Sequence, residues 1–335
     1  MDTVNLKKLA AELGLSPSTI SRALRDSHEI SKKTKDRVKA LAEKLDFRPN
    51  PHASSLRQNK SKTIAVIMPE IENNFFAQVI NGVESVAQKK GYHVLIYLTH
   101  EDFEKEKAIL QMLRNGRVDG LMISISNSTK SSEHLKSCQE AGLPMVFFDR
   151  ICEDIDVPII ATDDIDSSFR ATEHLLKNGC RHIAHLSMSD ALSISKGRQA
   201  GYNKALEKYK LSRYSSIIEC SSDDEKNRQI IRKLLLRKPR PDGIFASVEK
   251  LAINTYEVCR ELKIEIPATL KVVSFSNLTA AALFHPPLTT VVQPAYDIGK
   301  EAANILFRII DKKVLSRQEK KIIIPSTLVV RASTN

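Results

Sequence analysis

The sequence predicts a two-part protein, with an N-terminal all-α helix-turn-helix headpiece and a larger α/β part built on parallel sheets. Short helical patterns joined by a glycine occupy the N-terminus. From Lys62 onwards, short runs rich in β-branched residues alternate with amphipathic helical patterns, which is typical of parallel sheets covered by helices. The chain has 335 residues, of which 42% are hydrophobic, so it can bury more than one core.

In the headpiece, apolar residues at positions 4–13 fall on one face of a helix, and Gly14 can end that helix in a tight turn. A second helix is predicted to follow at once. Ser16 is a good N-cap for it, and Pro17 occupies the first helical position, where its missing N–H costs nothing. Two short helices joined in this way describe a helix-turn-helix, whose second helix enters the major groove of DNA.

The second helix should turn a hydrophilic face outward. This face consists of Pro17, Ser18, Ser21, Arg22 and Arg25. Small hydroxyl side chains allow close approach to DNA, and Arg22 can make a bidentate contact with guanine. Ser31 is then predicted to cap a third helix over residues 32–45.

Positive charge is concentrated in the same region. Residues 1–62 contain 14 Lys and Arg against 7 Asp and Glu, whereas the other 273 residues contain 37 against 33. A local excess of cations suits phosphate contacts, although a solvated charged surface has the same composition. Charge alone therefore does not decide between the two.

The α/β part contains eight runs that we predict as strands: TIAVIM, YHVLIYL, DGLMISI, PMVFFD, HIAHLSM, DGIFAS, LKVVSF and LTTVVQ. Two of them echo each other. RVDGLMIS (117–124) and RPDGIFAS (240–247) each place Asp-Gly before an apolar strand and after a helix. This echo indicates two similar α/β lobes built in succession.

The exact residue sequence of the N-terminus is a stronger signal than its helix pattern. The run from Val4 through LSPSTISRALRDSHEISKKTKDRV to FRPNPHASSL resembles, almost position by position, the headpiece of the LacI/GalR family of bacterial transcription regulators. The resemblance implies that the following residues face DNA bases or backbone: Asn5, Leu6, Ser16, Pro17, Ser18, Ser21, Arg22, Arg25 and Ser31.

The segment NPHASSLRQNKSK (50–62) resembles the hinge helix of the same family. Asn50 or the Pro49–Pro51 region would begin a short helix, and Ala53 and Leu56, three residues apart, would share one face. The resemblance implies that Asn50, Ala53 and Leu56 contact DNA. In a dimer on DNA, paired Leu56 side chains would wedge into a minor-groove step. A plain tether with an incidental leucine is the alternative interpretation.

The resemblance continues through the FFDR run, ATDD, the GRQAGY run, PDGIFAS and LTTVVQPAYDIGKEAA, and so covers nearly the whole chain. It implies a type I periplasmic-binding-protein-like domain of two lobes that the chain crosses three times. The expected divisions are a headpiece (1–48), a hinge (49–62) and an effector and dimerisation domain (63–335), with lobe one at about 63–161 plus 293–320 and lobe two at about 162–292 plus 321–335.

Ligands of open α/β sheets bind at the carboxyl ends of strands, here between the lobes. The effector candidates at these ends are Phe75, Phe76, Ser124, Arg150, Asp163, Asp164, Arg198, Glu249, Ser276 and Gln293. Phe75 and Phe76 suit stacking on a sugar or base ring or packing in the core. The two aspartates could equally be helix N-caps, and Gln293 could be structural. Arg198 matches the arginine that grips the effector in this family.

The chain departs from the family pattern at two positions. It has Val248-Glu249 where relatives usually have Asn-Asp, and Ser276 where they often have an aspartate that binds ligand hydroxyls. Losing that carboxylate while keeping Arg198 favours a sugar derivative over the simplest neutral sugar, and an anionic derivative is the hypothesis that follows. The effector is thus expected to be a sugar or sugar derivative.

We expect no catalytic residues, metal site or cofactor. No Walker A loop, GxGxxG or GxSxG occurs, and His182 and His185 would point to opposite sides of a strand. The five cysteines form no CxxC pair. The alternative to a regulator is a ligand-binding or enzymatic α/β protein whose basic N-terminus serves only association, and the absence of these motifs argues against an enzyme.

The family resemblance implies a repressor that binds a near-palindromic double-stranded operator and is modulated by its effector. Because one helix-turn-helix reads only a half-site, a homodimer is expected. The chain ends without a heptad tail, which disfavours a tail-made tetramer. Because we find neither a signal peptide nor a membrane span, we expect a cytoplasmic bacterial protein without a membrane partner.

Overall fold

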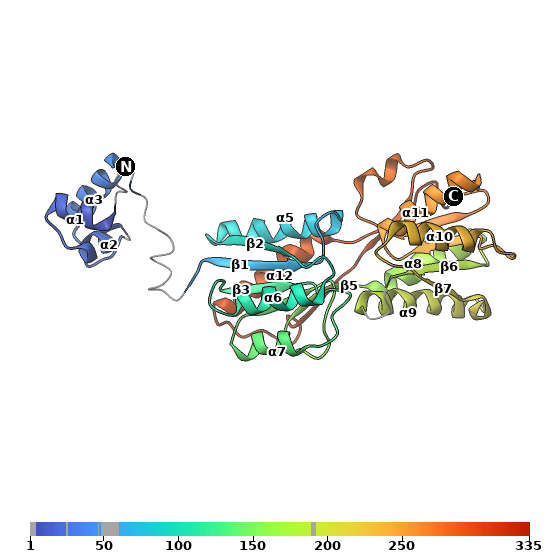
Figure 1. Ribbon diagram of the computed structural model, residues 1–335, viewed down its shortest axis with the longest axis horizontal. Helices are drawn as coiled ribbons and strands as arrows, with labels where there is room; N and C mark the ends of the chain where they lie inside the picture. The colour runs from blue at the N-terminus through green and yellow to red at the C-terminus, as the bar shows by residue number, and fades with distance from the viewer. Residues whose placement is uncertain (1–4, 25, 46, 48–59, 189–191) are drawn as a thin grey trace. The chain divides into compact units, whose positions relative to one another are not determined.

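The computed structural model describes residues 5–24, 26–45, 47, 60–188 and 192–335 (Figure 1). Four residues expected to contact DNA lie outside these ranges, namely Arg25, Asn50, Ala53 and Leu56. The chain divides into two compact units, Met1–Ser61 and Lys62–Asn335, and each is described by itself.

The described part of the headpiece contains the three predicted helices, α1 (Leu6–Leu13), α2 (Pro17–Leu24) and α3 (Lys32–Lys44). Asn5 and Ser31 cap α1 and α3 with their side-chain oxygens. Gly14 ends α1 in the left-handed conformation at φ 66°, which a glycine adopts without steric cost. Leu9 and Ile20, from the two helices of the helix-turn-helix, are fully buried together.

Residues 62–335 form two lobes, each with a six-stranded sheet. In the first sheet the strands run in the spatial order β11 (Lys321–Ile324), β5 (Ile159–Thr162), β4 (Met145–Phe148), β3 (Gly120–Ile123), β1 (Thr63–Met68) and β2 (His93–Leu98). In the second sheet the order is β12 (Thr327–Val329), β10 (Thr289–Val292), β9 (Lys271–Phe275), β8 (Gly243–Ala246), β6 (Ile183–Ser187) and β7 (Ser216–Glu219). Neighbouring strands are parallel except β10 and β12, which pair antiparallel.

Helices cover both faces of each sheet, as the unbroken apolar strands require. Around the first sheet lie α5 (Asn74–Lys89) and α12 (Ala295–Ile310) on one face, and α6 (Phe103–Leu113) and α7 (Glu133–Glu140) on the other. Around the second lie α8 (Asp164–Lys177) and α9 (Ser193–Lys208) on one face, and α10 (Asp224–Leu235) and α11 (Glu249–Leu262) on the other. Short 3₁₀ turns follow at η1 (Ser212–Tyr214) and η2 (Thr279–Leu283).

The sequence echo corresponds to equivalent strands of the two lobes. β3 and β8 hold the same place in the two strand orders. Their preceding aspartates also act alike, because each accepts a hydrogen bond from the backbone at the start of the adjacent strand. Asp119 accepts from the N–H of Lys62 at 3.1 Å, and Asp242 accepts from the N–H of His182 at 2.9 Å. The predicted succession of two similar lobes is confirmed.

One lobe boundary differs from the expectation. Residues 321–324, expected in the second lobe, form β11 and pair with β5 at the edge of the first sheet. The chain changes lobe only afterwards, at 325–326, before β12 joins the second sheet. The segment therefore belongs to lobe one, because its backbone completes that sheet.

Close helix packing depends on glycine in both lobes. A side chain on Gly299 of α12 would overlap the backbone carbonyl of Val79 in α5, and one on Gly201 of α9 would overlap that of Ile165 in α8. Both glycines come from sequence runs that resembled the family, DIGKEAA and GRQAGY. Their role in the fold is to let two helix backbones touch.

Replacing Gly299 with alanine should lower the free energy of unfolding by at least about 2 kcal/mol, because overpacking against backbone cannot be relieved by a rotamer change. Urea unfolding followed by circular dichroism measures the loss. Lys300→Ala, at the exposed neighbouring position, is the control and should change stability by less than about 0.5 kcal/mol. Equal stability of the two variants would contradict the close-packing role.

No helix in the described ranges is long and apolar enough to cross a membrane.

Candidate functional site

The headpiece presents most of its described DNA-contact candidates to solvent. Ser21 and Leu6 are half-buried, and the exposed members are Asn5, Ser16, Pro17, Ser18, Arg22 and Ser31. Ser16 also caps α2, since its Oγ accepts the N–H of Thr19 at 3.1 Å. These residues surround the start of α1, the exposed side of α2 and the start of α3, where backbone N–H groups attract phosphate oxygens.

On this surface, Arg22 forms an exposed ion pair with the carboxylate of Glu29. Its Nη1 lies 2.9 Å from Oε2 of Glu29, and both side chains are more than half exposed. A solvent-exposed ion pair of this kind contributes little stability, so the guanidinium can leave Glu29 for a base edge at small cost.

A cleft between the lobes of the α/β unit holds most of the effector candidates. Its floor, of about 40 Å³, is lined by seven of the ten candidates, namely Phe75, Phe76, Arg150, Arg198, Glu249, Ser276 and Gln293. An adjoining chamber of about 350 Å³ shares Arg150, Arg198 and Glu249 with the floor. The lining residues follow the carboxyl ends of strands in both lobes, as parallel sheets lead one to expect.

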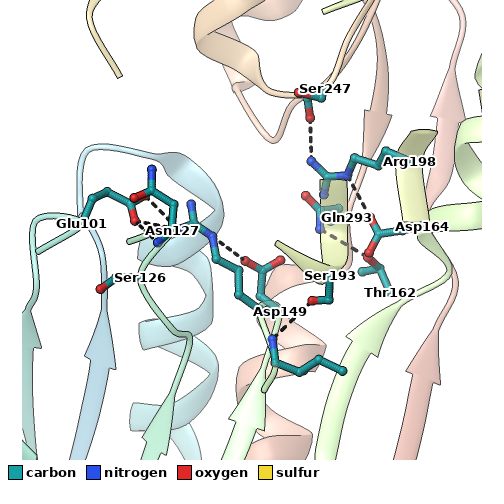
Figure 2. Close-up of polar contacts among 12 residues, drawn as sticks. Glu101, Ser126, Asn127, Asp149, Thr162, Asp164, Ser193, Arg198, Ser247 and Gln293 are labelled. Carbon is teal, nitrogen blue, oxygen red and sulfur yellow. Dashed lines mark hydrogen bonds and ion pairs between the residues drawn. The ribbon is translucent and has the colours of Figure 1, made fainter. Parts of the chain in front are cut away.

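Arg198 is the most constrained side chain of the cleft. Its Nε donates to Oδ1 of Asp164 at 2.8 Å, its Nη1 donates to the carbonyl oxygen of Ser247 at 2.5 Å, and its guanidinium lies 3.8 Å from the ring centroid of Phe275. Figure 2 shows it between Asp164 and Ser247. Fixed on three sides, Arg198 keeps Nη2 free of any hydrogen bond to a described residue.

Arg150 is fixed by a different device on the opposite lobe. Both oxygens of Glu101 accept from its Nη1, at 2.7 and 3.0 Å. Glu101 has a left-handed backbone at φ 59°, and its carboxylate also accepts the N–H of Asn127 at 2.7 Å (Figure 2). A strained conformation at a strand end that is held by several contacts is typical of a functional site.

Asp149 lies at the same depth and was not among the predicted residues. It follows β4 with a left-handed backbone at φ 59° and is almost fully buried. Burial raises the pKa of its carboxyl group, while the guanidinium groups of Arg150 and Arg198 act in the opposite direction. The sequence signal was its place in the FFDR run, directly before Arg150.

Glu249 and Ser276 form a direct pair. The hydroxyl of Ser276 donates to Oε2 of Glu249 at 2.6 Å. A carboxylate is thus present beside Ser276, supplied by the longer side chain of Glu249. The expectation of an anionic effector started from the absence of an aspartate at position 276, and the structure places the carboxylate of Glu249 beside that position.

Three predicted residues, Ser124, Asp163 and Asp164, line neither compartment of the cleft. Asp163 bridges the chain crossings between lobes, where its oxygens accept from the N–H of Ser326 at 2.7 Å and from Nη2 of Arg170 at 3.0 Å. Ser124 is fully buried at the end of β3. Neither residue lines the described cleft, and the contacts of Asp163 place it at the crossings between the lobes.

Three of the lining candidates, Phe75, Phe76 and Gln293, also have structural roles. Phe75 and Phe76 pack edge to face at 5.3 Å within the core of the first lobe, yet both reach the cleft floor. Gln293 lies at a lobe crossing, with its Nε2 3.4 Å from the hydroxyl of Thr162 (Figure 2). Asp163 is the N-cap residue of α8 but makes no side-chain cap hydrogen bond, and Asp164, the first residue of that helix, accepts a hydrogen bond from Arg198.

The Asp164–Arg198 pair should make effector binding depend on pH. Burial raises the pKa of Asp164 to about 6, against the opposing charge of Arg198. Protonation below that pH removes the charge that orients Arg198, so effector affinity should fall several-fold between pH 7 and pH 5. Titration calorimetry over this range measures it, and Asp164→Asn should flatten the profile.

The same carboxyl group of Asp164 should have the opposite effect on the free energy of unfolding, which it should raise as the pH falls. The folded-state pKa of Asp164 exceeds the unfolded value near 3.9, so its contribution to stability is full below about pH 4 and is lost as the pH rises through about 6. Buried His185, whose pKa falls to about 4, has the opposite slope. The difference between the wild-type and Asp164→Asn unfolding curves isolates the Asp164 contribution, and a zero difference would contradict it.

A helix-turn-helix unit joined to a two-lobed α/β unit with a charged cleft defines a DNA-binding regulator with a small-molecule-binding domain. Residues 5–50 match the family model described as "Bacterial regulatory proteins, lacI family", and residues 172–334 match "Periplasmic binding protein-like domain". The chain is 31% identical to the ribose operon repressor of Halalkalibacterium halodurans over 98% of this chain and 96% of that protein. It belongs to the LacI family and is a transcriptional regulator.

Two further comparisons agree with this assignment. The transcriptional repressor PurR of Histophilus somni is 29% identical, with 98% of each chain covered. The crystal structure of the lac repressor dimer bound to operator and the anti-inducer ONPF has the same fold, with a TM-score of 0.86, 22% identity and 99% of each chain covered. The resemblance given by the N-terminal run and the later landmarks is confirmed.

Proposed function

We propose that the protein is a homodimeric, cytoplasmic repressor that binds a near-palindromic operator through its headpieces and that a neutral, hydroxyl-rich effector in the interlobe cleft controls this binding. No catalytic step is part of the proposal. The DNA-binding part is supported by the exposed Arg22, Ser16 and Ser18 around a complete helix-turn-helix, and by relatives that are named as repressors.

The charge pattern of the cleft carries the proposal of a neutral effector. All four cationic side chains that line the larger chamber already have a carboxylate partner, Arg150 with Glu101, Arg198 with Asp164, Arg228 with Glu225 and Lys250 with Asp224. Three lining carboxylates, Glu70, Glu72 and Glu249, have no ion-pair partner among the described residues. An anionic ligand would meet an excess of negative charge, whereas hydroxyl groups can donate to it.

The carboxylate of Glu249 and the donors of Arg198 lie on the same floor. Together with Asp149 and Asn277 they offer both acceptors and donors to vicinal hydroxyls, and Phe76 offers an apolar surface to ring C–H groups. The sequence departure at Ser276 is compatible with this function because Glu249 reaches the same place.

A ligand screen on the full-length protein tests the effector class. Neutral sugars, sugar acids, sugar phosphates and amino sugars are compared by thermal shift, and the hits by titration calorimetry with and without operator DNA. We expect a neutral sugar to bind and to change operator affinity. Binding restricted to sugar acids or sugar phosphates would overturn the proposed class. A preference for an amino sugar would also overturn a neutral effector, because it would mean that the unpaired carboxylates select a positively charged group on the ligand.

Selection from a random pool of double-stranded oligonucleotides tests the DNA-binding part. A near-palindromic sequence should be enriched by the dimer. Failure to enrich any such sequence, with and without the screened ligands, would overturn the proposal that this chain binds a near-palindromic operator.

The hinge proposal rests on the family resemblance of residues 50–62, most of which lie outside the described residues. Leu56→Ser should weaken specific operator binding at least ten-fold, because a serine gains nothing from wedging between base pairs. Effector affinity should stay unchanged. Fluorescence anisotropy with labelled operator measures the first effect, and unchanged operator affinity would favour a plain tether.

A further inference from the structure

The cleft is unevenly filled, and most of its open space lies away from the floor. The floor holds about 40 Å³, because Phe75, Phe76 and Phe275 fill it from the two lobes. The adjoining chamber holds about 350 Å³ and extends along the second lobe, beside the first turns of α11. A ligand of one sugar ring seated on the floor would leave this chamber to solvent.

Two polar groups in the chamber wall have no partner. Ser247 and Asn254 are each about 2% exposed, and both line the chamber. Neither Oγ of Ser247 nor Oδ1 of Asn254 has a hydrogen-bond partner among the described residues. A buried polar atom left unpaired costs about 1–3 kcal/mol, so such atoms beside a cavity point to a ligand or water that pairs them.

The chamber matches a second ring of the same chemistry. Met188, Ile194 and Ile253 supply apolar surface for ring C–H groups. The cations at its rim are engaged, since Lys250 donates to the carbonyl oxygen of Ser222 at 2.7 Å and Arg228 lies 3.3 Å from Glu257. The groups left to address a ligand are a hydroxyl, an amide and unpaired carboxylates, which recognise hydroxyls and not anions.

We propose that the effector carries at least two sugar-like rings, with one ring on the floor beside Arg198 and Glu249 and the second in the chamber, where Ser247 and Asn254 bind its hydroxyls. The proposal rests on the neutral, hydroxyl-rich effector class proposed above. It makes Ser247 and Asn254 specificity-determining residues that select ligand length. Arg198 links the two compartments, because it lines both and donates to the backbone of Ser247.

Titration calorimetry of the full-length protein tests this proposal with glucose, ribose, galactose, cellobiose, maltose and lactose as probes. A disaccharide should bind at least ten-fold more tightly than its component monosaccharides. Asn254→Leu and Ser247→Ala should each lower disaccharide affinity at least five-fold and leave monosaccharide affinity unchanged. Neither should lower the unfolding temperature by much, since each removes an unpaired polar group.

Asn203→Leu is the matched control, because Asn203 is exposed on α9 and lines neither compartment. It should leave all affinities unchanged. If a monosaccharide binds as tightly as any disaccharide, and if neither chamber variant changes its affinity, the two-ring proposal is overturned and the neutral-effector proposal stands. If the variants weaken monosaccharide binding equally, their role is structural and the proposal also fails. If the folded protein binds no neutral saccharide in this or the wider screen, the effector class itself is overturned.

Discussion

Replacing Arg198 with methionine and Asp164 with asparagine together should lower effector affinity at least 100-fold. The double variant removes the guanidinium that lines both compartments of the cleft, along with its 2.8 Å partner. Charge-assisted hydrogen bonds contribute about 1.5–3 kcal/mol each, so losing two donors to the ligand accounts for this factor. Operator binding without effector should be retained, because the headpiece is untouched. Anisotropy titrations with and without effector measure both quantities.

The double variant is needed because Arg198→Met alone would change both effector affinity and stability, and the two effects could not be separated. Arg198→Met alone leaves the buried Asp164 carboxylate without its partner, which typically costs about 3–5 kcal/mol of stability. Replacing both groups removes the charge as well. The control is Arg232→Met with Glu261→Gln, an exposed ion pair between α10 and α11. It should change neither stability nor effector affinity, and an equal loss in both double variants would exclude a specific role for Arg198.

The central strands and the headpiece helices could be predicted because their signals are local. β1, β3, β4 and β8 are continuous apolar runs buried on both faces, and the caps of α1 and α3 are side-chain oxygens that are visible in the sequence. Four strands that were not predicted, β5, β7, β11 and β12, have only three or four residues, and none of them is buried along its whole length. Their position in the sheet is decided by pairing with a neighbouring strand that is distant in the sequence, and a local residue pattern carries no information about that partner.

The lobe assignment of residues 321–324 failed for the same reason. KIII is apolar enough to extend either sheet, and only pairing with β5 places it in the first. The chain thus crosses between lobes after β11, at a point held by Asp163, Arg170 and the backbone of Ser326.

The residues at the strand ends that line the cleft could be predicted, but the contacts among their side chains could not. Arg198 and Glu249 were named from their sequence positions. That Glu249 reaches Ser276 depends on how the start of α11 is placed against the end of β9. Asp149, Ser247 and Asn254 were missed because their significance lies in burial and, for the last two, in unpaired atoms. The charge balance of the cleft, on which the proposal of a neutral effector rests, follows from these contacts.

On the DNA side, replacing Arg22 with alanine should lower the affinity for the selected operator 10- to 100-fold in each half-site and relax the preference at one base position. A bidentate arginine–guanine contact provides about 1–3 kcal/mol of discrimination, and Arg22 leaves only an exposed ion pair with Glu29 to make it. Arg37→Ala, which removes the same charge from an exposed position on α3, is the matched control. It should weaken specific and non-specific binding alike through loss of one phosphate-attracting charge, leaving their ratio unchanged. Competition anisotropy with operator and scrambled duplexes at two salt concentrations separates the two effects. If Arg22→Ala lowers both affinities by the same factor, Arg22 contacts the DNA backbone and does not read sequence.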